Sequence, residues 1–535
     1  MNLNPQCFGL SLPWLLFSFH LFENPLLNGL MRKIPAVMAT QHPDNSHPPH
    51  WGHAPFISTL HEIEECYHVF SDLECDEYMW DWEGKFVDEA VIDRLFNVYS
   101  EYFGKHQLGK EKFLTFRIPN LWNEKGMRVA RAFMSIITAA HIAKEYKVHC
   151  PPLFEVILPM TTKAEQLLTI LKKFNQSILY ERSIFEKASI PKNHLEMIPL
   201  IEGSVTLMES HKILTQYVKG HQALYGFKPK YLRPFIARSD PALDAGFIPA
   251  TLSARAAISE YYRFAEESKI HVFPILGVGG GHFRGGLSPY TIERFLELYG
   301  GIRTVTLQSA FIYDHPLTTV KAAIHRLKAA LPRSRPTRFT NSELKTIFKL
   351  SEIFSDQYRP VVQSLATMIN DIARYIPRHR ERIAHTGHFG YSRKVGSQQV
   401  NLPRAITFAG VFYSLGIPPM FIGSGRGLKE IIKRGFEKDF QKFIPGLERD
   451  FVTAGFFLNR ENLKFLGKKN MAWQAIEKDI AFIEEYLGVK LGPARSEHFI
   501  HRNLTSNIYH YWKQAKEKEI PEEILHAARV RRFIG

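Results

Sequence analysis

Short apolar segments alternate with longer amphipathic segments along the middle of this chain, and this alternation constrains the fold more than any other feature. The short segments are FLTFRIP (113–119), LFEVILPM (153–160), EMIPLIEG (196–203), KYLRPFIAR (230–238), HVFPILG (271–277), RTVTLQ (303–308), RIAHTGHFG (382–390) and PPMFIGSG (418–425). They are too short for helices, and most lack the polar/apolar alternation of a half-exposed strand, as expected for parallel strands buried on both faces. The segments between them, such as 163–175, 251–268 and 289–300, have helical periodicity. About eight such β/α units predict a (β/α)8 TIM barrel, and an open doubly wound sheet is the alternative.

The segments outside this alternation predict added helices. The proline- and arginine-rich segment LPRSRPTR (331–338) leads into a helical insertion over about 338–376, and after residue 427 the pattern is almost wholly helical. We therefore expect one domain over 31–535, with the barrel at about 110–427 and a C-terminal helical cover at about 428–535. Residues 8–22 are apolar, but they lack the basic start and cleavage site of a signal peptide. Met31 resembles a natural start, so residues 1–30 are interpreted as a non-native or disordered extension.

The charge balance narrows the classes of function. The chain has Lys+Arg 68 against Asp+Glu 53, a formal net charge of +15, which suits nucleic acid, an anionic membrane surface or small acidic substrates. The basic residues are dispersed and no aromatic residues interleave with them, so small anions are favoured over RNA or a membrane. The four cysteines show no CxxC pair and no metal-ligand spacing, which is typical of a cytoplasmic protein with free thiols.

Charged and polar residues recur where the predicted strands end. The C-terminal ends of the strands carry the chemistry of such barrels, and here they supply Arg117, Glu202, Arg238, Asp240, Arg284 and Gln308, with Arg393 and Arg404 beyond the seventh predicted strand. Scattered surface charge would not select the same end of strand after strand. Because arginine recognises phosphate and carboxylate in a bidentate manner, the set predicts a site for a small, multiply charged phospho-acid.

Two of these residues form a candidate metal site. Glu202 in PLIEG and Asp240 in ARSDP follow the third and fourth predicted strands, so their carboxylates are expected to face each other across one edge of the rim. Hard oxygen ligands of this kind suit Mg²⁺, with Mn²⁺ as the alternative.

Two motifs could serve either structure or catalysis. The glycine-rich stretch LGVGGGHFRGG (276–286) is costly to order, and it is either a loose surface loop or a mobile lid that presents Arg284 and backbone N–H groups. His42 in TQHPDN (40–45) is either a surface histidine or a general base brought over the rim from outside the barrel.

Several motifs together resemble archaeal-type phosphoenolpyruvate carboxylase. They are MATQHPDN, MWDWEGK (79–85), FRIPN and the succession ARSDPALDAG…GVGGGHFRGG, and the resemblance runs from about Lys33 to the C-terminus. Compared with motifs of the family's longer form, the residues that match its histidine, its metal ligands and its arginines are His42, Glu202, Asp240, Arg284, Arg393, Arg404 and Arg117. Leu243 and Val278 stand where the longer form has a lysine and an arginine, so those two cations have no counterpart here.

The resemblance implies a specific reaction. On a TIM barrel of the phosphoenolpyruvate/pyruvate-binding type with Mg²⁺, phosphoenolpyruvate and bicarbonate would give oxaloacetate and phosphate, through carboxyphosphate and a metal-stabilised enolate. It implies that His42 is the base and that Arg284, Arg393 and Arg404 are catalytic, in a cytoplasmic homotetramer that replenishes the citric acid cycle. A phosphomutase or aldolase of the same barrel group is one alternative, and a basic RNA-binding protein is a weaker one. In MWDWEGK, Asp81 and Glu83 either line the site or form an ion pair with Lys85.

Overall fold

The computed structural model describes residues 33–124, 126–148, 150–184, 190–191, 194–381, 393–395 and 398–535. Two units are distinguished, Met1–Lys33 and Ile34–Gly535, and every element named here belongs to the second. The extension predicted at 1–30 lies outside the described residues.

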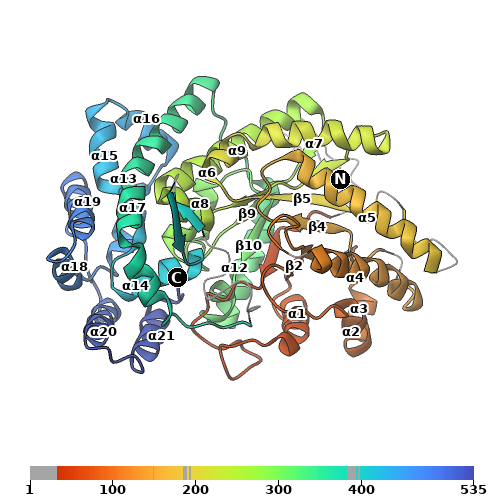
Figure 1. The fold of residues 1–535 in the computed structure, drawn as a ribbon, viewed down its shortest axis with the longest axis horizontal. Helices are drawn as coiled ribbons and strands as arrows, with labels where there is room; N and C mark the ends of the chain where they lie inside the picture. Colours follow the sequence, from red (N-terminus) through yellow and green to blue (C-terminus); the bar gives the residue numbers. More distant parts are fainter. Residues whose placement is uncertain are drawn as a thin grey trace, which may run out of the picture. The chain divides into compact units, whose positions relative to one another are not determined.

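Within the described residues, eight parallel strands close into a barrel in the order β1-β10-β9-β7-β5-β4-β3-β2 (Figure 1). This confirms the predicted (β/α)8 fold and excludes the open sheet. The barrel strands are β1 (Val37–Thr40), β2 (Glu77–Asp81), β3 (Phe113–Arg117), β4 (Glu155–Leu158), β5 (Glu196–Ile201), β7 (Phe235–Ala237), β9 (Ile275–Gly277) and β10 (Thr304–Leu307). The short strands β6 (Tyr231–Leu232) and β8 (His271–Val272) pair with each other ahead of β7 and β9.

The barrel begins earlier in the chain than predicted. The predicted strands omit β1 and β2. Of their last two members, 382–390 lies outside the described residues, and 418–425 is not a strand but forms the 3₁₀ turn η5 (Pro419–Phe421) and the start of α15 (Ser424–Lys433). Pro418 and Pro419 have no N–H to give to a strand ladder, which explains why this apolar run is not a strand. The barrel strands therefore run from Val37 to Leu307 and not over 110–427.

Alternation along the strands divides the barrel interior into levels. Because successive side chains of a strand point to opposite faces, Glu77, Met79 and Asp81 of β2 all face inward. Met79 belongs to the apolar middle level, which is formed by Met38, Met79, Ile157, Ile198, Leu200, Phe235, Ala237 and Ile275. Glu77 makes a buried ion pair with Arg233 at the N-terminal ends of the strands, and Asp81 makes one with Arg117 at the C-terminal ends. The buried ion pair of Glu77 thus fills the N-terminal end of the barrel interior. The C-terminal end is also polar, and the site lies there.

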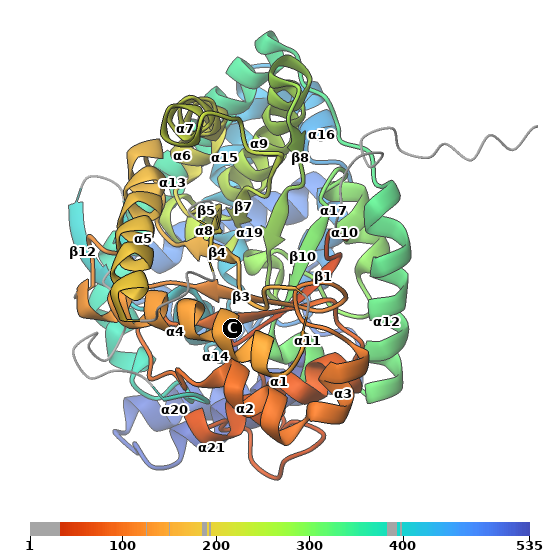
Figure 2. The same ribbon diagram turned by 90° about the vertical axis from the view of Figure 1, so that its right-hand side faces the viewer.

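Helices surround the strands, as Figure 2 shows for α4, α5 and α12. The helices between β1 and the insertion are α1 (Glu62–Ser71), α2 (Val91–Val98), α3 (Ser100–Lys105), α4 (Gly126–Glu145), α5 (Ala164–Ile184), α6 (Ser204–Met208), α7 (Ser210–Tyr225), α8 (Ser239–Ala245), α9 (Phe247–Ser268), α10 (Ile292–Leu298), α11 (Ser309–Tyr313) and α12 (Leu317–Ala330). The three helices predicted by periodicity correspond to α5, α9 and α10.

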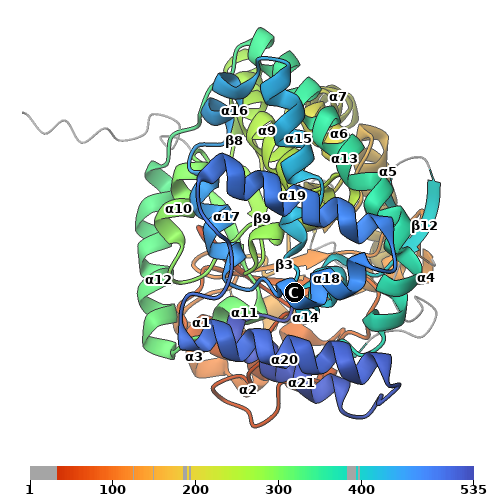
Figure 3. The ribbon, with the colours of Figure 1, turned by 90° about the vertical axis from the view of Figure 1, so that its left-hand side faces the viewer.

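The predicted insertion is a single helix, α13 (Asn341–Ala373), which begins at a capping box formed by Thr340 and Glu343. The hairpin of β11 (Arg393–Val395) and β12 (Gln398–Leu402) leads into α14 (Ala405–Ser414). The predicted C-terminal cover is helical (Figure 3); after α15 it comprises α16 (Glu437–Phe443), α17 (Leu447–Gly455), α18 (Arg460–Gly467), α19 (Met471–Leu487), α20 (Ser496–Lys513) and α21 (Ile520–Arg531).

No single helix in the described part of the chain is long and apolar enough to cross a membrane, and one pair bent by 97°, Ala405–Ser414 with Pro419–Lys433, passes on length and composition only.

Candidate active site

A cavity at the C-terminal ends of the barrel strands brings most of the predicted residues together. Its walls come from the strand ends, from the segment after α13 and from the start of α14, and they include His42, Arg117, Glu202, Arg238, Asp240, Arg284, Gln308 and Arg404. His42 lies two residues after the end of β1, so it belongs to the barrel rim and is not brought over it from outside. Arg393 lies in β11, and its side chain is outside the described residues.

Arg117, at the end of β3, is held by two buried acids from the neighbouring strand β2 and the residues after it. Its Nε and Nη2 atoms donate to Asp81 Oδ1 and Oδ2 at 2.8 and 2.6 Å, and its Nη1 lies 3.1 Å from Glu83 Oε2. Burial would raise the pKa of Asp81, but the guanidinium of Arg117 outweighs burial and holds that pKa well below its usual range. The bidentate pair therefore fixes a permanently charged arginine in the cavity wall.

The same acids connect a second arginine to the site. Arg404, at the start of α14, donates from Nη2 to Glu83 Oε1 at 3.0 Å and stays partly exposed. Lys85 forms a buried ion pair with Glu62. The contacts of Asp81 and Glu83 with Arg117 and Arg404 favour the alternative in which these acids line the site.

Arg284 lies in the 3₁₀ turn η2 (His282–Arg284) and is 1% exposed. Its guanidinium donates to Asp44 Oδ2 at 3.0 Å, to Ser239 Oγ at 3.2 Å, to Gln308 Oε1 and to the carbonyl oxygen of Gly535. Burial raises the pKa of Asp44, against the lowering effect of Arg284. Arg284 thus lines the cavity as part of a closed hydrogen-bond network.

The glycine-rich stretch is packed against this network and is not a loose loop. A side chain at Gly279 would come within 2.6 Å of Arg284 Cζ, so the guanidinium lies directly on that glycine. Gly285 has φ +117°, a conformation that side chains rarely adopt, and Val278 fills the space beside it. Close approach and positive φ explain these two glycines, whereas the predicted lid motion stays a prediction.

Arg238 is enclosed more completely than the sequence predicts. It is fully buried, and its guanidinium donates to Tyr299 Oη at 3.0 Å, to the carbonyl oxygens of Phe283 and Phe247, and to Thr251 Oγ1 at 2.6 Å. With these partners it ties the glycine-rich stretch to α9. The geometry favours a positioning role for Arg238 over the substrate contact predicted for it.

His42 is half-buried at the cavity wall, and one of its ring nitrogens is engaged in a hydrogen bond. Its Nδ1 lies 2.9 Å from Thr40 Oγ1, and Thr40 donates its own proton to the carbonyl oxygen of Leu307 at 3.4 Å. In the tautomer in which Nδ1 carries the proton, Thr40 Oγ1 accepts a hydrogen bond from it and Nε2 is the basic atom of neutral His42. Desolvation lowers the pKa of His42 well below its ordinary value, and the charges of Arg117, Arg284 and Arg404 lower it further, although Asp81 opposes them.

The lowered pKa of His42 predicts an unusual pH profile. A base is active when unprotonated, so His42 should stay competent down to a pH well below 6.5, the ordinary histidine value. At saturating substrates the acid limb of kcat should lie below that value. Arg404→Gln removes one lowering charge and should move the limb upward, whereas Arg326→Gln on the surface should not. An acid limb at or above the ordinary value would contradict the assignment.

Glu202 and Asp240 lie at the ends of the paired strands β5 and β7, and both line the cavity half-buried. The backbone N–H of Met160 lies 3.4 Å from Glu202 Oε1. An adjoining hollow is lined by Glu202, Asp240 and Asp244, so a third carboxylate borders the same space. Hard divalent cations prefer carboxylate oxygens and keep several water ligands. Partly exposed carboxylates of this kind therefore fit Mg²⁺.

Comparison with known proteins decides the family. The family model described as phosphoenolpyruvate carboxylase matches residues 34–535. Curated proteins named phosphoenolpyruvate carboxylase from Leuconostoc mesenteroides, Metallosphaera sedula and Methanothermobacter thermautotrophicus are 39, 37 and 35% identical, over 94% of this chain and 99, 100 and 100% of theirs. The chain belongs to the phosphoenolpyruvate carboxylase family. Among solved structures, a malate synthase from Haloferax volcanii aligns over 61% of this chain and 80% of its own, with 10% identity and a TM-score of 0.34, too distant to bear on function.

In this member of the phosphoenolpyruvate carboxylase family, sequence reasoning missed several residues of the site. The segment after α13 brings Arg378, His379 and Arg380 to the cavity, and Asp44 holds Arg284. Desolvation lowers the pKa of His379 to about 4, despite a hydrogen bond to the backbone of Asn45 that raises it. Asp44 lies within the motif TQHPDN and could have been noticed there, whereas the RHRER run around Arg378 carries no local signal of a site.

Proposed function

We propose that this chain catalyses the carboxylation of phosphoenolpyruvate by bicarbonate, giving oxaloacetate and phosphate. The observation that carries the proposal is one cavity in which six arginines, two carboxylates and a neutral histidine converge at the barrel rim of a phosphoenolpyruvate carboxylase family member. The alternatives, a phosphomutase or aldolase and an RNA-binding protein, are disfavoured by the family.

Three of these arginines are placed to bind the anionic groups of the substrates. Arg404 is partly exposed and Arg378 is exposed at the cavity, so both can reach a phosphate or carboxylate that enters from solvent. Arg117 is pre-oriented by its acids. Charge-assisted hydrogen bonds of this kind contribute about 1.5–3 kcal/mol each, and a phosphoryl group that is surrounded by fixed cations is open to attack by an anionic nucleophile.

Glu202 and Asp240 are the proposed ligands of Mg²⁺, with Mn²⁺ as a possible substitute. A divalent cation bound there would stabilise negative charge that develops on a substrate oxygen. The backbone N–H of Met160 orients the Glu202 carboxylate.

His42 is the proposed base. A bicarbonate oxygen attacks phosphorus and the phosphorus–enol oxygen bond breaks, giving carboxyphosphate and the enolate of pyruvate. Nε2 of His42 then takes the carboxyphosphate proton, the carbon–oxygen bond to phosphate breaks, and CO₂ and phosphate form. The enolate carbon attacks CO₂ to give oxaloacetate. The neutral state of His42 supports this role, because an imidazolium could not accept the proton.

The proposed activity is tested by oxaloacetate formation, coupled to malate dehydrogenase, with and without bicarbonate. We expect turnover that requires both bicarbonate and a divalent cation. Turnover of phosphoenolpyruvate that is independent of bicarbonate would favour a phosphomutase or aldolase, and salt-sensitive RNA binding without turnover would favour the binding protein.

Asp240→Asn should raise the Mg²⁺ concentration needed for half-maximal activity steeply while leaving the fold intact. The amide keeps the shape of the side chain but removes a charged oxygen ligand. Mg²⁺ titration of activity measures the effect, and Asp93→Asn, on α2, is a matched control. An Asp240→Asn enzyme with unchanged metal dependence would remove this ligand assignment.

We further propose a cytoplasmic homotetramer whose C-terminal helices help to form the interfaces. Large apolar side chains are exposed along this part of the chain: Phe465, Met471, Val489, Phe499 and Ile500. Exposed apolar surface of this kind marks association sites. Light scattering on the purified protein gives the oligomeric state directly.

A further inference from the structure

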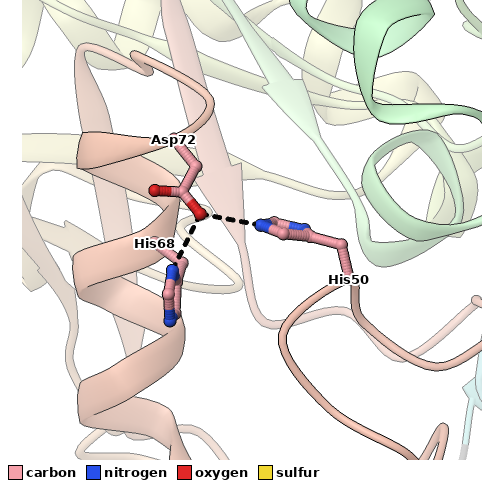
Figure 4. A group of neighbouring side chains, drawn as sticks. All are labelled: His50, His68 and Asp72. Atoms are coloured by element: carbon pink, nitrogen blue, oxygen red, sulfur yellow. Dashed lines mark hydrogen bonds and ion pairs between the residues drawn. The ribbon is translucent and has the colours of Figure 1, made fainter.

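Two histidines and one aspartate meet outside the cavity, where the segment after β1 passes the end of α1 (Figure 4). Asp72 Oδ2 lies 2.9 Å from His50 Nε2 and 2.8 Å from His68 Nδ1. The three ligand atoms all lie within 4.8 Å of one another. One carboxylate oxygen thus joins two imidazoles that come from different parts of the chain.

Neighbouring groups hold these three side chains in place. The ring of Trp51 stacks on His68, with centroids 5.5 Å apart and planes 7° apart. Ser71 Oγ donates to Asp72 Oδ1 at 2.8 Å, and Glu64 Oε1 lies 3.8 Å from the other nitrogen of His68, Nε2. Histidines that bind metals commonly give their second N–H to a carboxylate, which orients the ring. Glu64 lies just outside hydrogen-bond distance of that nitrogen, and a short approach would bring it into this role.

We propose that His50, His68 and Asp72 bind one divalent transition-metal ion of the zinc type, with solvent completing the coordination. Two imidazole nitrogens and one carboxylate oxygen, with an open fourth position, form a common tetrahedral zinc set. Ligation uses the lone pairs of His50 Nε2 and His68 Nδ1, so the protons of the neutral rings move to His50 Nδ1 and His68 Nε2. The second of these faces Glu64.

The dimensions of the cluster suit such an ion. A tetrahedral ion with ligands at about 2.0–2.1 Å separates its donor atoms by about 3.3 Å, so the two measured separations need to widen by only a few tenths of an ångström. The side chains of His50, His68 and Asp72 are 25, 22 and 34% exposed, which leaves an entry path.

This site differs in chemistry and in place from the proposed Mg²⁺ site. Mg²⁺ prefers all-oxygen coordination, whereas imidazole nitrogens select zinc-like ions. An ion here would tie the segment after β1 to α1. That segment starts with His42 and Asp44, and it is also held through Ser46 and His47, whose backbone N–H groups donate to Asp314. The expected effect of the ion is therefore on local stability.

Metal titration of the full chain tests the proposal, with Zn²⁺ by calorimetry and Co²⁺ by visible absorption. Excess Mg²⁺ occupies the oxygen site, and accessible thiols are alkylated beforehand because Cys150 is not fully buried. We expect one equivalent to bind, Co²⁺ bands typical of tetrahedral nitrogen and oxygen ligands, and a higher Tm with Zn²⁺. His50→Ala and His68→Gln should abolish all three, and His61→Gln, at the other end of α1, should abolish none.

The Glu64→Gln variant distinguishes a specific metal site from adventitious binding of metal by two exposed histidines. Glu64→Gln leaves the three ligands intact but removes the charged partner of His68, and it should weaken Zn²⁺ binding by about 10–100-fold. Wild-type protein that binds no Zn²⁺, or binding that survives His68→Gln, would overturn the proposal. Unchanged affinity in Glu64→Gln would show that Glu64 does not orient a ligand, and it would overturn that part.

Discussion

The His42→Asn variant should form oxaloacetate about 10²–10⁴-fold more slowly than the wild type, because it lacks the proposed base. It should still bind phosphoenolpyruvate and Mg²⁺, since Arg117, Arg404 and the two carboxylates are unchanged. His42 is proposed to act after phosphorus is attacked, so its loss should uncouple the two half-reactions. Carboxyphosphate formed slowly in the variant would revert or hydrolyse and release pyruvate and phosphate.

Product analysis in the presence of bicarbonate measures this uncoupling. His53→Asn, in the same segment but exposed, is the matched control and should behave as the wild type. His379 is a second histidine in the cavity wall, so His379→Asn tests the rival base. Near-normal oxaloacetate formation by His42→Asn would reduce His42 to a structural residue, and release of pyruvate by His379→Asn alone would move the role to His379.

Arg233→Met should destabilise the fold by about 3–5 kcal/mol, because it leaves two buried glutamates without their partner. Arg233 is buried at the N-terminal ends of the strands, where it lies 2.6 Å from Glu77 Oε2 and 2.5 Å from Glu155 Oε2. It also donates to Thr304 Oγ1 at 3.2 Å. The site lies at the opposite end of the barrel, so the loss should appear in stability before it appears in KM.

The denaturation midpoint in urea, followed by circular dichroism, measures this effect. Arg326→Met is the matched control, because Arg326 also forms a two-bond ion pair, with Glu293, but on the surface. Exposed pairs contribute about 0–1 kcal/mol, so the control should change little. If Arg233→Met does not accumulate as folded protein, adding Glu77→Gln and Glu155→Gln should restore folding by removing the buried charges. Equal, small losses in both variants would refute the expectation.

The sequence alone determined the fold class and the chemical character of the site. Six of the eight barrel strands follow from their apolar runs, because parallel strands buried on both faces need continuous apolar residues. Glu202, Asp240, Arg117 and Arg284 follow from their places at strand ends. These properties are local, since a short window of residues shows each of them.

The first two strands could not be found in this way. β1 has only four residues, which is too short to stand out as an apolar run. β2 (EYMWD) carries an acid at each end, so its sequence lacks the continuous apolar character of a buried strand. Those acids are buried because distant residues neutralise them: Arg233 pairs with Glu77, and Arg117 pairs with Asp81. The predicted count of eight strands is correct, although the predicted strand at 418–425 is not one of them.

Only the tertiary structure decided which charged groups meet. Arg284 reaches Asp44 from 240 residues away and Gly535 from 251 residues away, and Arg404 reaches Glu83 across 321 residues. Whether an arginine faces a substrate or is held inside the protein, as Arg238 is, depends on these partners. Local sequence encodes the preference of a segment for strand or helix, but the closure of the barrel selects which distant side chains become neighbours, and burial then forces those charges to pair.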